Sequence, residues 1–193
     1  MVVVGLLASI HTLGVLCAIA TDQQFTSNLP YNFTLIASNS TFPDASITGV
    51  PLVLGQNGAT TGATVYVTST YASYPYNDYP SLALTDHSLR AFTASGEWFT
   101  NATAQLSGRP LAWLASKYYR PPAAQDYSAV HVPAHPFPLL AAHGMQNLWS
   151  LCSASGPHGQ VNVVFNVPAG PARLGFDPAR CYAVMLHMIK KEW

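Results

Sequence analysis

Four tyrosines lie close together near the middle of the chain, and their grouping suits the binding of sugars. The four are Tyr71, Tyr74, Tyr76 and Tyr79. A tyrosine ring packs against the apolar face of a pyranose, and polar groups such as those of the intervening Asn77 and Asp78 can hydrogen-bond to its hydroxyls. The commoner alternative is that these rings pack a long loop onto the protein, because buried and exposed aromatic residues look alike in a sequence. The segment is therefore a candidate carbohydrate-stacking site.

The acidic residues form no recognisable catalytic pair. Glycoside hydrolysis uses two carboxylates that face one substrate. The acids from residue 21 onward are Asp22, Asp44, Asp78, Asp86, Glu97, Asp126, Asp177 and Glu192. Most lie beside turn residues, which favours turn and capping roles. A Gly-x-Ser-x-Gly elbow and a glycine-rich phosphate loop are both absent from the sequence. We expect no catalytic residues and no cofactor, with a small extracellular hydrolase as an alternative.

Histidines are the residues most suited to hold a metal. His131 and His135 are four residues apart and His143 is nearby. The remaining candidates are His87, His158 and His187. Two histidines at this spacing meet on one face of a helix, but three prolines between 133 and 138 rule out a helix here. No carboxylate or thiolate completes a ligand set, so we expect no metal site.

The first twenty residues have the character of a secretory signal peptide. Residues 1–20 are apolar almost throughout and end in Ala18-Ile-Ala20, a small-x-small triplet that predicts cleavage before Thr21. The run lacks a Lys or Arg ahead of it. A membrane anchor or a buried first strand is the alternative, although the run is barely long enough to span a bilayer. We expect residues 21–193 to form one secreted domain, without a membrane anchor after cleavage.

The cysteines and three sequons agree with secretion. Cys17 falls in the signal peptide, which leaves Cys152 and Cys181 as an even number in an oxidising compartment. A disulfide between them is predicted, with two buried free thiols as the alternative. N-glycosylation sequons begin at Asn32, Asn39 and Asn101.

Charge is scarce and balanced. Only 8% of the residues are charged, with eight Lys plus Arg against eight Asp plus Glu, whereas about a quarter is usual. No basic face is available for nucleic acid. Solubility must then depend on Ser, Thr, Asn and attached sugars, a surface typical of extracellular proteins. Cell wall polysaccharide is the partner that we expect.

Short strand-like runs separated by turns account for most of the chain. They lie at 33–37, 50–54, 63–68, 82–84, 89–92, 97–99, 111–115, 129–132, 147–152, 161–167 and 181–188. Only 139–144 has helical character. This pattern predicts a single compact all-β domain, either a β-trefoil-like barrel or a two-sheet β-sandwich. Trp98, Trp113 and Trp149 fall inside apolar runs and are expected in the core.

Several of these runs also carry a family resemblance. Leu148-Trp-Ser-Leu-Cys152, the valine-rich run 161–167 and Cys181-Tyr-Ala-Val-Met-Leu186 resemble the closing section of fungal secreted cell-surface proteins, the phialide-associated (PhiA-like) group. The runs 33–37 and 51–58 are similar to that group's opening strands. The resemblance implies a non-enzymatic protein of the fungal wall or extracellular matrix, with no catalytic residues to carry over.

Together these observations predict a secreted, N-glycosylated protein of the cell wall or extracellular matrix with a structural or carbohydrate-binding role. A secreted effector or lectin-like binding module is the alternative from another class.

Overall fold

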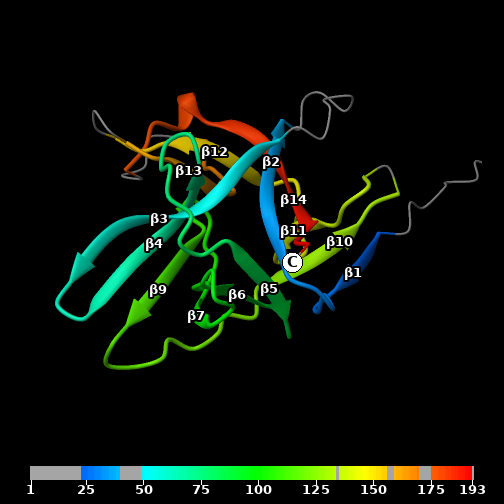
Figure 1. The fold of residues 1–193 in the computed structure, drawn as a ribbon. Helices are drawn as coiled ribbons and strands as arrows, with labels where there is room; N and C mark the ends of the chain where they lie inside the picture. Colours follow the sequence, from blue (N-terminus) through cyan, green and yellow to red (C-terminus); the bar gives the residue numbers. More distant parts are fainter. Residues whose placement is uncertain (1–22, 40–48, 134, 156–158, 170–174, 193) are drawn as a thin grey trace, which may run out of the picture.

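The computed structural model describes residues 23–39, 49–133, 135–155, 159–169 and 175–192, and the chain described there is all-β (Figure 1). Its strands are β1 (Gln24–Thr26), β2 (Phe33–Asn39), β3 (Val50–Thr60), β4 (Ala63–Thr70), β5 (Ser81–Thr85), β6 (Ser88–Phe92), β7 (Trp98–Asn101), β8 (Arg109–Pro110), β9 (Ala112–Ser116), β10 (Tyr127–His131), β11 (Leu139–Ala142), β12 (Trp149–Ser153), β13 (Val161–Phe165) and β14 (Tyr182–Lys190). A short 3-10 turn, η1 (Pro178–Arg180), precedes β14. Within these ranges no helix has the length and apolar character needed to cross a membrane. The predicted signal peptide lies outside the described residues.

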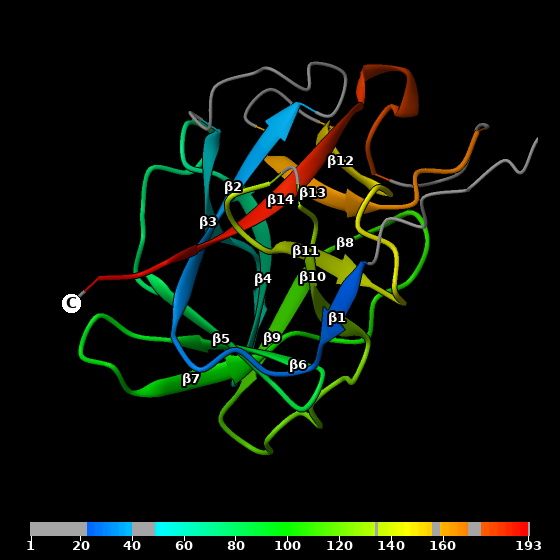
Figure 2. The same ribbon diagram turned by 90° about the vertical axis from the view of Figure 1, so that its right-hand side faces the viewer.

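Six strands close into a barrel in the order β2-β3-β4-β13-β12-β14, and β14 pairs with β2 to complete the ring. All of these pairings are antiparallel. The closing pair runs from Phe33 opposite Lys190 to Asn39 opposite Val184. Figure 2 shows β2 and β14 side by side across the front of the barrel. The expected all-β fold is confirmed, and it takes the form of a closed barrel.

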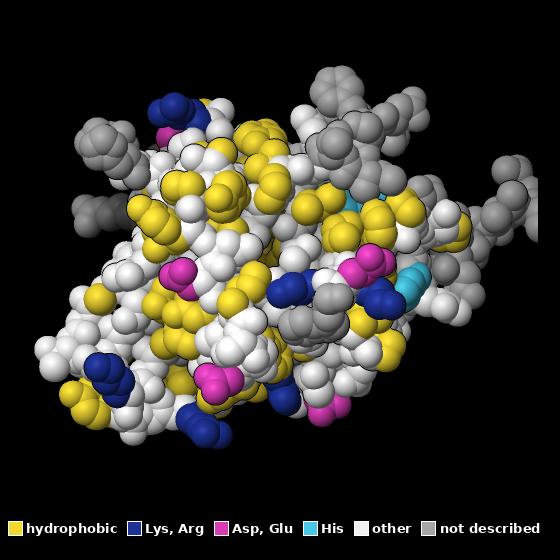
Figure 3. Space-filling view, viewed as in Figure 1, with side chains coloured by type: hydrophobic (Ala, Val, Ile, Leu, Met, Phe, Trp, Pro, Cys, Tyr) yellow, Lys and Arg dark blue, Asp and Glu magenta, His cyan; other side chains and the backbone are white. Residues whose placement is uncertain are grey.

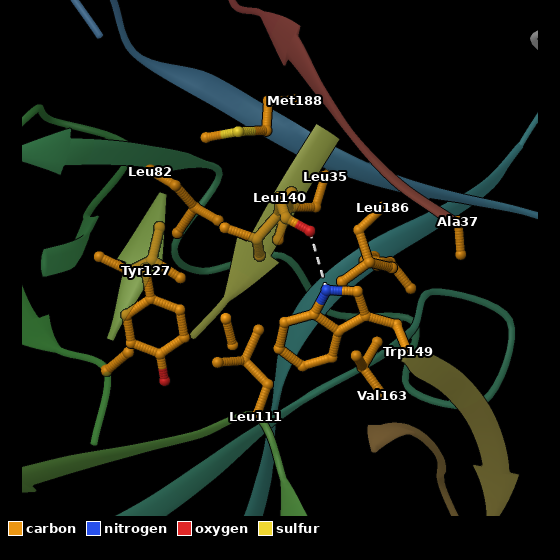
Figure 4. Close-up of a cluster of buried hydrophobic side chains, with 14 of the residues drawn as sticks. Leu35, Ala37, Leu82, Leu111, Tyr127, Leu140, Trp149, Val163, Leu186 and Met188 are labelled. Carbon is orange, nitrogen blue, oxygen red and sulfur yellow. Dashed lines mark hydrogen bonds between the residues drawn. The ribbon is translucent and has the colours of Figure 1, made fainter. Parts of the chain in front are cut away.

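The inward faces of the strands form the core. In β2, Phe33, Leu35 and Ala37 are buried and alternate with less buried neighbours, as a strand with one face on a core requires. Figure 4 shows Trp149 among the leucines of this cluster, where its Nε1 donates to the carbonyl oxygen of Leu140 at 2.8 Å. Trp113 is also fully buried and donates to Thr68 Oγ1 at 3.0 Å. The core positions expected for Trp113 and Trp149 are confirmed.

The strands outside the barrel pair with individual barrel strands. β5, β6 and β7 continue from β2, β11, β10 and β1 continue from β14, and β9 pairs with β4. In Figure 1, β3, β4 and β9 extend together to one side. The helical character expected at 139–144 was wrong, because residues 139–142 form β11. All four residues of β11 are buried, and a strand with both faces covered has a continuous apolar run rather than an alternating one.

The predicted disulfide is present. Cys152 near the end of β12 is bonded to Cys181, which directly precedes β14, at an S–S distance of 2.07 Å. The two cysteines are 29 residues apart in the sequence. Closing a loop of that length stabilises the folded chain by about 3–4 kcal/mol, mainly by restricting the unfolded chain. The bond thereby fixes two adjacent barrel strands to each other.

Candidate functional site

The segment 71–80, which holds the four tyrosines, is the connection between β4 and β5. The backbone N–H of Tyr71 donates to the carbonyl oxygen of Pro51 at 2.8 Å. Ser73 Oγ donates to the carbonyl oxygen of Thr70 at 3.0 Å and accepts from the N–H of Val161 at 2.9 Å. These bonds attach the segment to β3, β4 and β13. The tyrosines are therefore presented by a loop that the barrel holds in place.

The four tyrosines divide into three surface rings and one packed ring. Tyr71 is 45% exposed and Tyr76 is 61% exposed. Tyr74 is half-buried and meets Tyr76 edge to face, with the ring centroids 5.2 Å apart. Tyr79 stacks on Phe99 instead, so for this residue the packing alternative holds. Burial raises the pKa of the Tyr79 hydroxyl, as does its hydrogen bond with Tyr66, so the group stays protonated at any physiological pH.

A small hollow, which we call the tyrosine cavity, lies beside this loop. Its volume is about 160 Å³ and its walls are mainly apolar, with Leu52 and Leu82 among them. Tyr71, Asn77 and Tyr79 contribute its polar groups from the loop. The structure thus brings two of the four tyrosines and the predicted amide to one hollow, whereas Tyr74, Tyr76 and Asp78 do not line it. An apolar wall with a few polar groups at its edge suits the face of one neutral sugar ring.

A larger hollow, which we call the Trp98 groove, was not found from the sequence. Its volume is about 420 Å³, and it lies between the β3–β4 hairpin tip, β7 and the segment after β9. Its aromatic lining consists of Tyr66, Trp98, Phe99 and Tyr119. Trp98 is 36% exposed, so the core position expected for it was wrong. Trp98 begins β7, and among the described strands β7 is the last of the sheet path. The sequence Lys117-Tyr-Tyr-Arg120 was the available signal for this site.

The three glycosylation candidates differ in exposure. Asn39 is exposed at the end of β2. Asn32 is half-buried, and its Nδ2 donates to Ser81 Oγ at 2.9 Å. Asn101 accepts from Trp98 Nε1 through its Oδ1 at 3.2 Å, so it lies at the rim of the Trp98 groove. N-glycosylation at all three remains a prediction, and a glycan on Asn32 would attach to Nδ2, the atom that donates to Ser81 Oγ.

The described histidines form no metal-binding cluster, although His135 and His187 are neighbours with ring centroids 5.5 Å apart. Among the residues that the structure describes, no three His, Cys, Asp or Glu side chains come together as metal ligands do. His87 Nδ1 lies 3.0 Å from the carbonyl oxygen of Tyr127. His143 Nε2 lies 2.8 Å from the carbonyl oxygen of Gln105, and His143 Nδ1 lies 3.9 Å from Asp126 Oδ1. These rings join loops, whereas His158 lies outside the described residues.

One histidine forms a pair with a serine. His187 Nε2 is 2.7 Å from Ser38 Oγ, and burial, together with the neighbouring His135, lowers the pKa of His187. Nucleophilic catalysis by a serine requires a neutral imidazole beside the hydroxyl to act as the base. It also requires another group that orients the imidazole. In the described part of the chain His187 Nδ1 is buried without a hydrogen-bond partner. Neither residue lines the tyrosine cavity or the Trp98 groove. Among the described residues the pair therefore has no group that orients the base.

No protein-family model matches the chain, and no curated protein or solved structure is significantly similar to it.

Proposed function

We propose that this is a secreted, N-glycosylated, non-catalytic protein of a cell wall or extracellular matrix that binds neutral polysaccharide at the tyrosine cavity. The observation that carries the proposal is the meeting of Tyr71, Asn77 and Tyr79 at one mainly apolar hollow. Tyr71 is 45% exposed, so its ring is accessible to a ligand. Asn77 is exposed, and its side chain makes no hydrogen bond with the described residues, so its amide can serve a sugar hydroxyl.

The character of the surface supports this proposal. With 8% charged residues the chain has few ionic groups, and Figure 3 shows them scattered among polar and hydrophobic side chains on one face. A weakly charged, hydroxyl-rich surface suits contact with neutral polysaccharide, because no strong field opposes or replaces stacking and hydrogen bonding. The fungal wall is the setting that the sequence resemblance implies.

The disulfide and the sequons support the extracellular setting. Disulfides persist in oxidising compartments, and a bond between Cys152 and Cys181 agrees with passage through one. Expression of residues 1–193 in a secreting eukaryotic host tests the setting directly. We expect the released protein to begin at Thr21 and to lose mass on enzymatic removal of N-glycans. A retained Met1 or an unchanged mass would contradict the proposal.

The binding test uses the released protein with insoluble chitin and with insoluble β-glucan. We expect loss of protein from the supernatant on at least one of them, with no sugar released. Tyr71→Ala should restore most of the protein to the supernatant, because one aromatic platform is lost. Tyr182→Ala is the matched control, since Tyr182 is 46% exposed and lies at the start of β14 away from the cavity.

Other outcomes favour the alternatives. Release of soluble sugar would favour a hydrolase and would make the carboxylates the candidates for catalysis. Absence of both binding and release would favour an effector or lectin-like module with a different ligand. Equal retention of Tyr71→Ala and the wild type would show that the tyrosine cavity is not the binding site.

A further inference from the structure

We propose that the Trp98 groove is a second binding site, specific for acidic sugars, and that its ligand is a uronate-bearing oligosaccharide. The sugar ring would stack on the exposed aromatic rings, and its carboxylate would pair with Arg120 and Lys117. The site is separate from the tyrosine cavity and makes no use of its residues, because the two hollows have no lining residue in common.

The groove offers aromatic surface to a ligand. Tyr119 is 56% exposed and Trp98 is 36% exposed, and both line the hollow. Tyr66 and Phe99 are less exposed and contact each other edge to face, with centroids 5.5 Å apart. A volume of about 420 Å³ leaves room for more than one sugar ring.

The Trp98 ring is held in a fixed orientation. Its Nε1 donates to Asn101 Oδ1 at 3.2 Å, and the guanidinium carbon of Arg120 lies 5.0 Å from its ring centroid. The guanidinium is therefore placed over the indole by a cation–π contact before any ligand binds. A stacking ring and a cation are held together in advance, which lowers the ordering cost of binding.

The charge of the groove is positive. Lys117 and Arg120 line it, and no acidic side chain does. No ion pair involves either cation in the described parts of the chain. Glu97 directly precedes Trp98 but does not line the hollow. In Figure 3, basic and hydrophobic side chains lie together at the lower left, over the β3–β4 hairpin tip and the end of β9. The chain as a whole has no net charge, so this local excess of positive charge favours an anionic ligand.

An acidic sugar matches this combination better than a neutral one. A neutral sugar would leave both cations without an anionic partner, whereas a carboxylate accepts two parallel hydrogen bonds from a guanidinium. The hydroxyls of Thr60 and Thr64 also line the groove, and they can serve the sugar hydroxyls. The aromatic rings, the cations and the threonine hydroxyls of the groove thus match the ring, the carboxylate and the hydroxyls of a uronate.

Single-stranded nucleic acid is the competing ligand, because it also combines stacking with anionic groups. Its binding depends on a basic track that neutralises several phosphates. The chain has eight Lys plus Arg balanced by eight Asp plus Glu, and two of the cations line this groove. We therefore favour a ligand with one carboxylate per ring, and a single-stranded oligonucleotide becomes an arm of the test.

The test compares two probes that differ only in charge. Calorimetric titration of the folded, secreted protein uses a tetragalacturonate and the same tetrasaccharide with every carboxyl methyl-esterified. The N-glycans are first trimmed enzymatically to one residue, because Asn101 lies at the rim of the groove. We expect the acidic form to bind at least about tenfold more tightly, and its affinity to fall as salt rises from about 0.05 to 0.5 M.

Two variants locate the binding. Arg120→Gln should weaken tetragalacturonate binding about tenfold and leave the weak binding of the ester unchanged, because a charged hydrogen bond is lost. Arg180→Gln is the matched control, since it removes one positive charge from η1, next to the disulfide. Trp98→Phe keeps a ring in place, and titration of Trp98→Phe should lack the change in tryptophan fluorescence that the wild type shows on binding.

Each remaining outcome overturns the proposal. Equal affinity for acid and ester would mean that the cations do not recognise the ligand. An equal effect of Arg120→Gln and Arg180→Gln would mean that net charge, rather than the groove, attracts it. Tighter binding of a single-stranded oligonucleotide, or no binding of either sugar to protein with an unchanged unfolding midpoint, would also contradict it.

The two proposals fail independently. Tyr71→Ala should abolish retention on neutral polysaccharide without affecting tetragalacturonate. Arg120→Gln should have the reverse effect. Loss of both activities in either variant alone would mean that the hollows are not separate sites.

Discussion

Tyr79 stacks face to face on Phe99, with the ring centroids 3.8 Å apart and the ring planes inclined by 13°. Tyr79 lines the tyrosine cavity and Phe99 lines the Trp98 groove. Tyr66 meets both rings edge to face, at centroid distances of 5.4 and 5.5 Å. The two hollows therefore lie on opposite sides of one aromatic wall. Substitutions in this aromatic wall should affect both hollows, whereas substitutions at the rim of one hollow should affect that hollow alone.

The first prediction concerns this wall. Tyr79→Ala should lower the free energy of unfolding by about 2–4 kcal/mol, because a stacked ring is replaced by a cavity. Tyr79→Phe keeps the stack and loses only the 3.3 Å contact with the Tyr66 hydroxyl, so it should cost about 0.5–1.5 kcal/mol. Urea unfolding measures both changes. Tyr76→Ala, which truncates an exposed ring on the same loop, is the control, and an equal effect of the two alanine variants would refute the shared wall.

The second prediction concerns the disulfide. The double variant Cys152→Ser, Cys181→Ser should unfold with a free energy about 3–4 kcal/mol below that of the wild type, because the unfolded chain regains the freedom of a 29-residue loop. Wild-type protein unfolded in the presence of a reductant should show the same shift in urea midpoint. A midpoint that neither treatment moves would mean that the bond does not stabilise the barrel.

The third prediction concerns acid. Burial lowers the pKa of His187 below its ordinary value of 6.5, and His135 acts in the same direction with its ring centroid 5.5 Å away. Between 6.5 and the lowered value the unfolded chain binds more protons than the folded chain, so stability falls as the pH drops through this window. Above the window His187 is neutral in both states and has no effect on the slope.

Urea unfolding at several values between about pH 7.5 and 5 measures this slope. His187→Gln should have a flatter dependence than the wild type, whatever its stability at neutral pH. His131→Gln is the control, because His131 is exposed. A slope that stays the same in His187→Gln would assign the acid sensitivity to another group.

The fourth prediction concerns the hairpin tip beside the Trp98 groove. Gly62 has a φ of +79°, and a Cβ at this position would collide with the ring of Tyr118. Its carbonyl oxygen also accepts from the N–H of Lys117 at 2.8 Å. Gly62→Ala should therefore cost about 1–2 kcal/mol from the backbone alone. It should also weaken tetragalacturonate binding, because displacement of the Tyr118 ring disturbs its neighbours Lys117 and Tyr119, which line the groove.

Gly58→Ala is the matched control for this change. It lies in the same hairpin, and an added Cβ there meets no atom within 4 Å. Urea unfolding and calorimetric titration should show little change in Gly58→Ala. Unaltered binding by Gly62→Ala would show that the groove does not depend on the position of this segment.

Local patterns in the sequence were sufficient for the elements and the disulfide. The strand-like run 161–167 predicted β13, although Asn162 and Val164 are buried as well as Val163 and Phe165, so burial does not alternate along the strand. The pairing of Cys152 with Cys181 followed from their number in an oxidising compartment. The strand follows from the types of neighbouring residues, and the disulfide follows from the number of cysteines, so neither inference needs the tertiary structure.

Tertiary contacts decided which aromatic residues are accessible. Leu139–Ala142 is a strand because it pairs with β10 and β14. Trp98 is 36% exposed because, among the described strands, the sheet path ends at β7. Tyr79 differs from Tyr71 for the same reason, since Phe99 is 20 residues away in the chain and reaches Tyr79 only after β5, β6 and β7 have folded back. The sequence by itself determined an all-β chain with one disulfide and a supply of aromatic residues. The tertiary structure decided where those aromatic residues meet, through the pairing of β2 with β14 and the folding of the middle strands. Contacts of this kind join residues that are far apart in the chain, so no local sequence pattern predicts them.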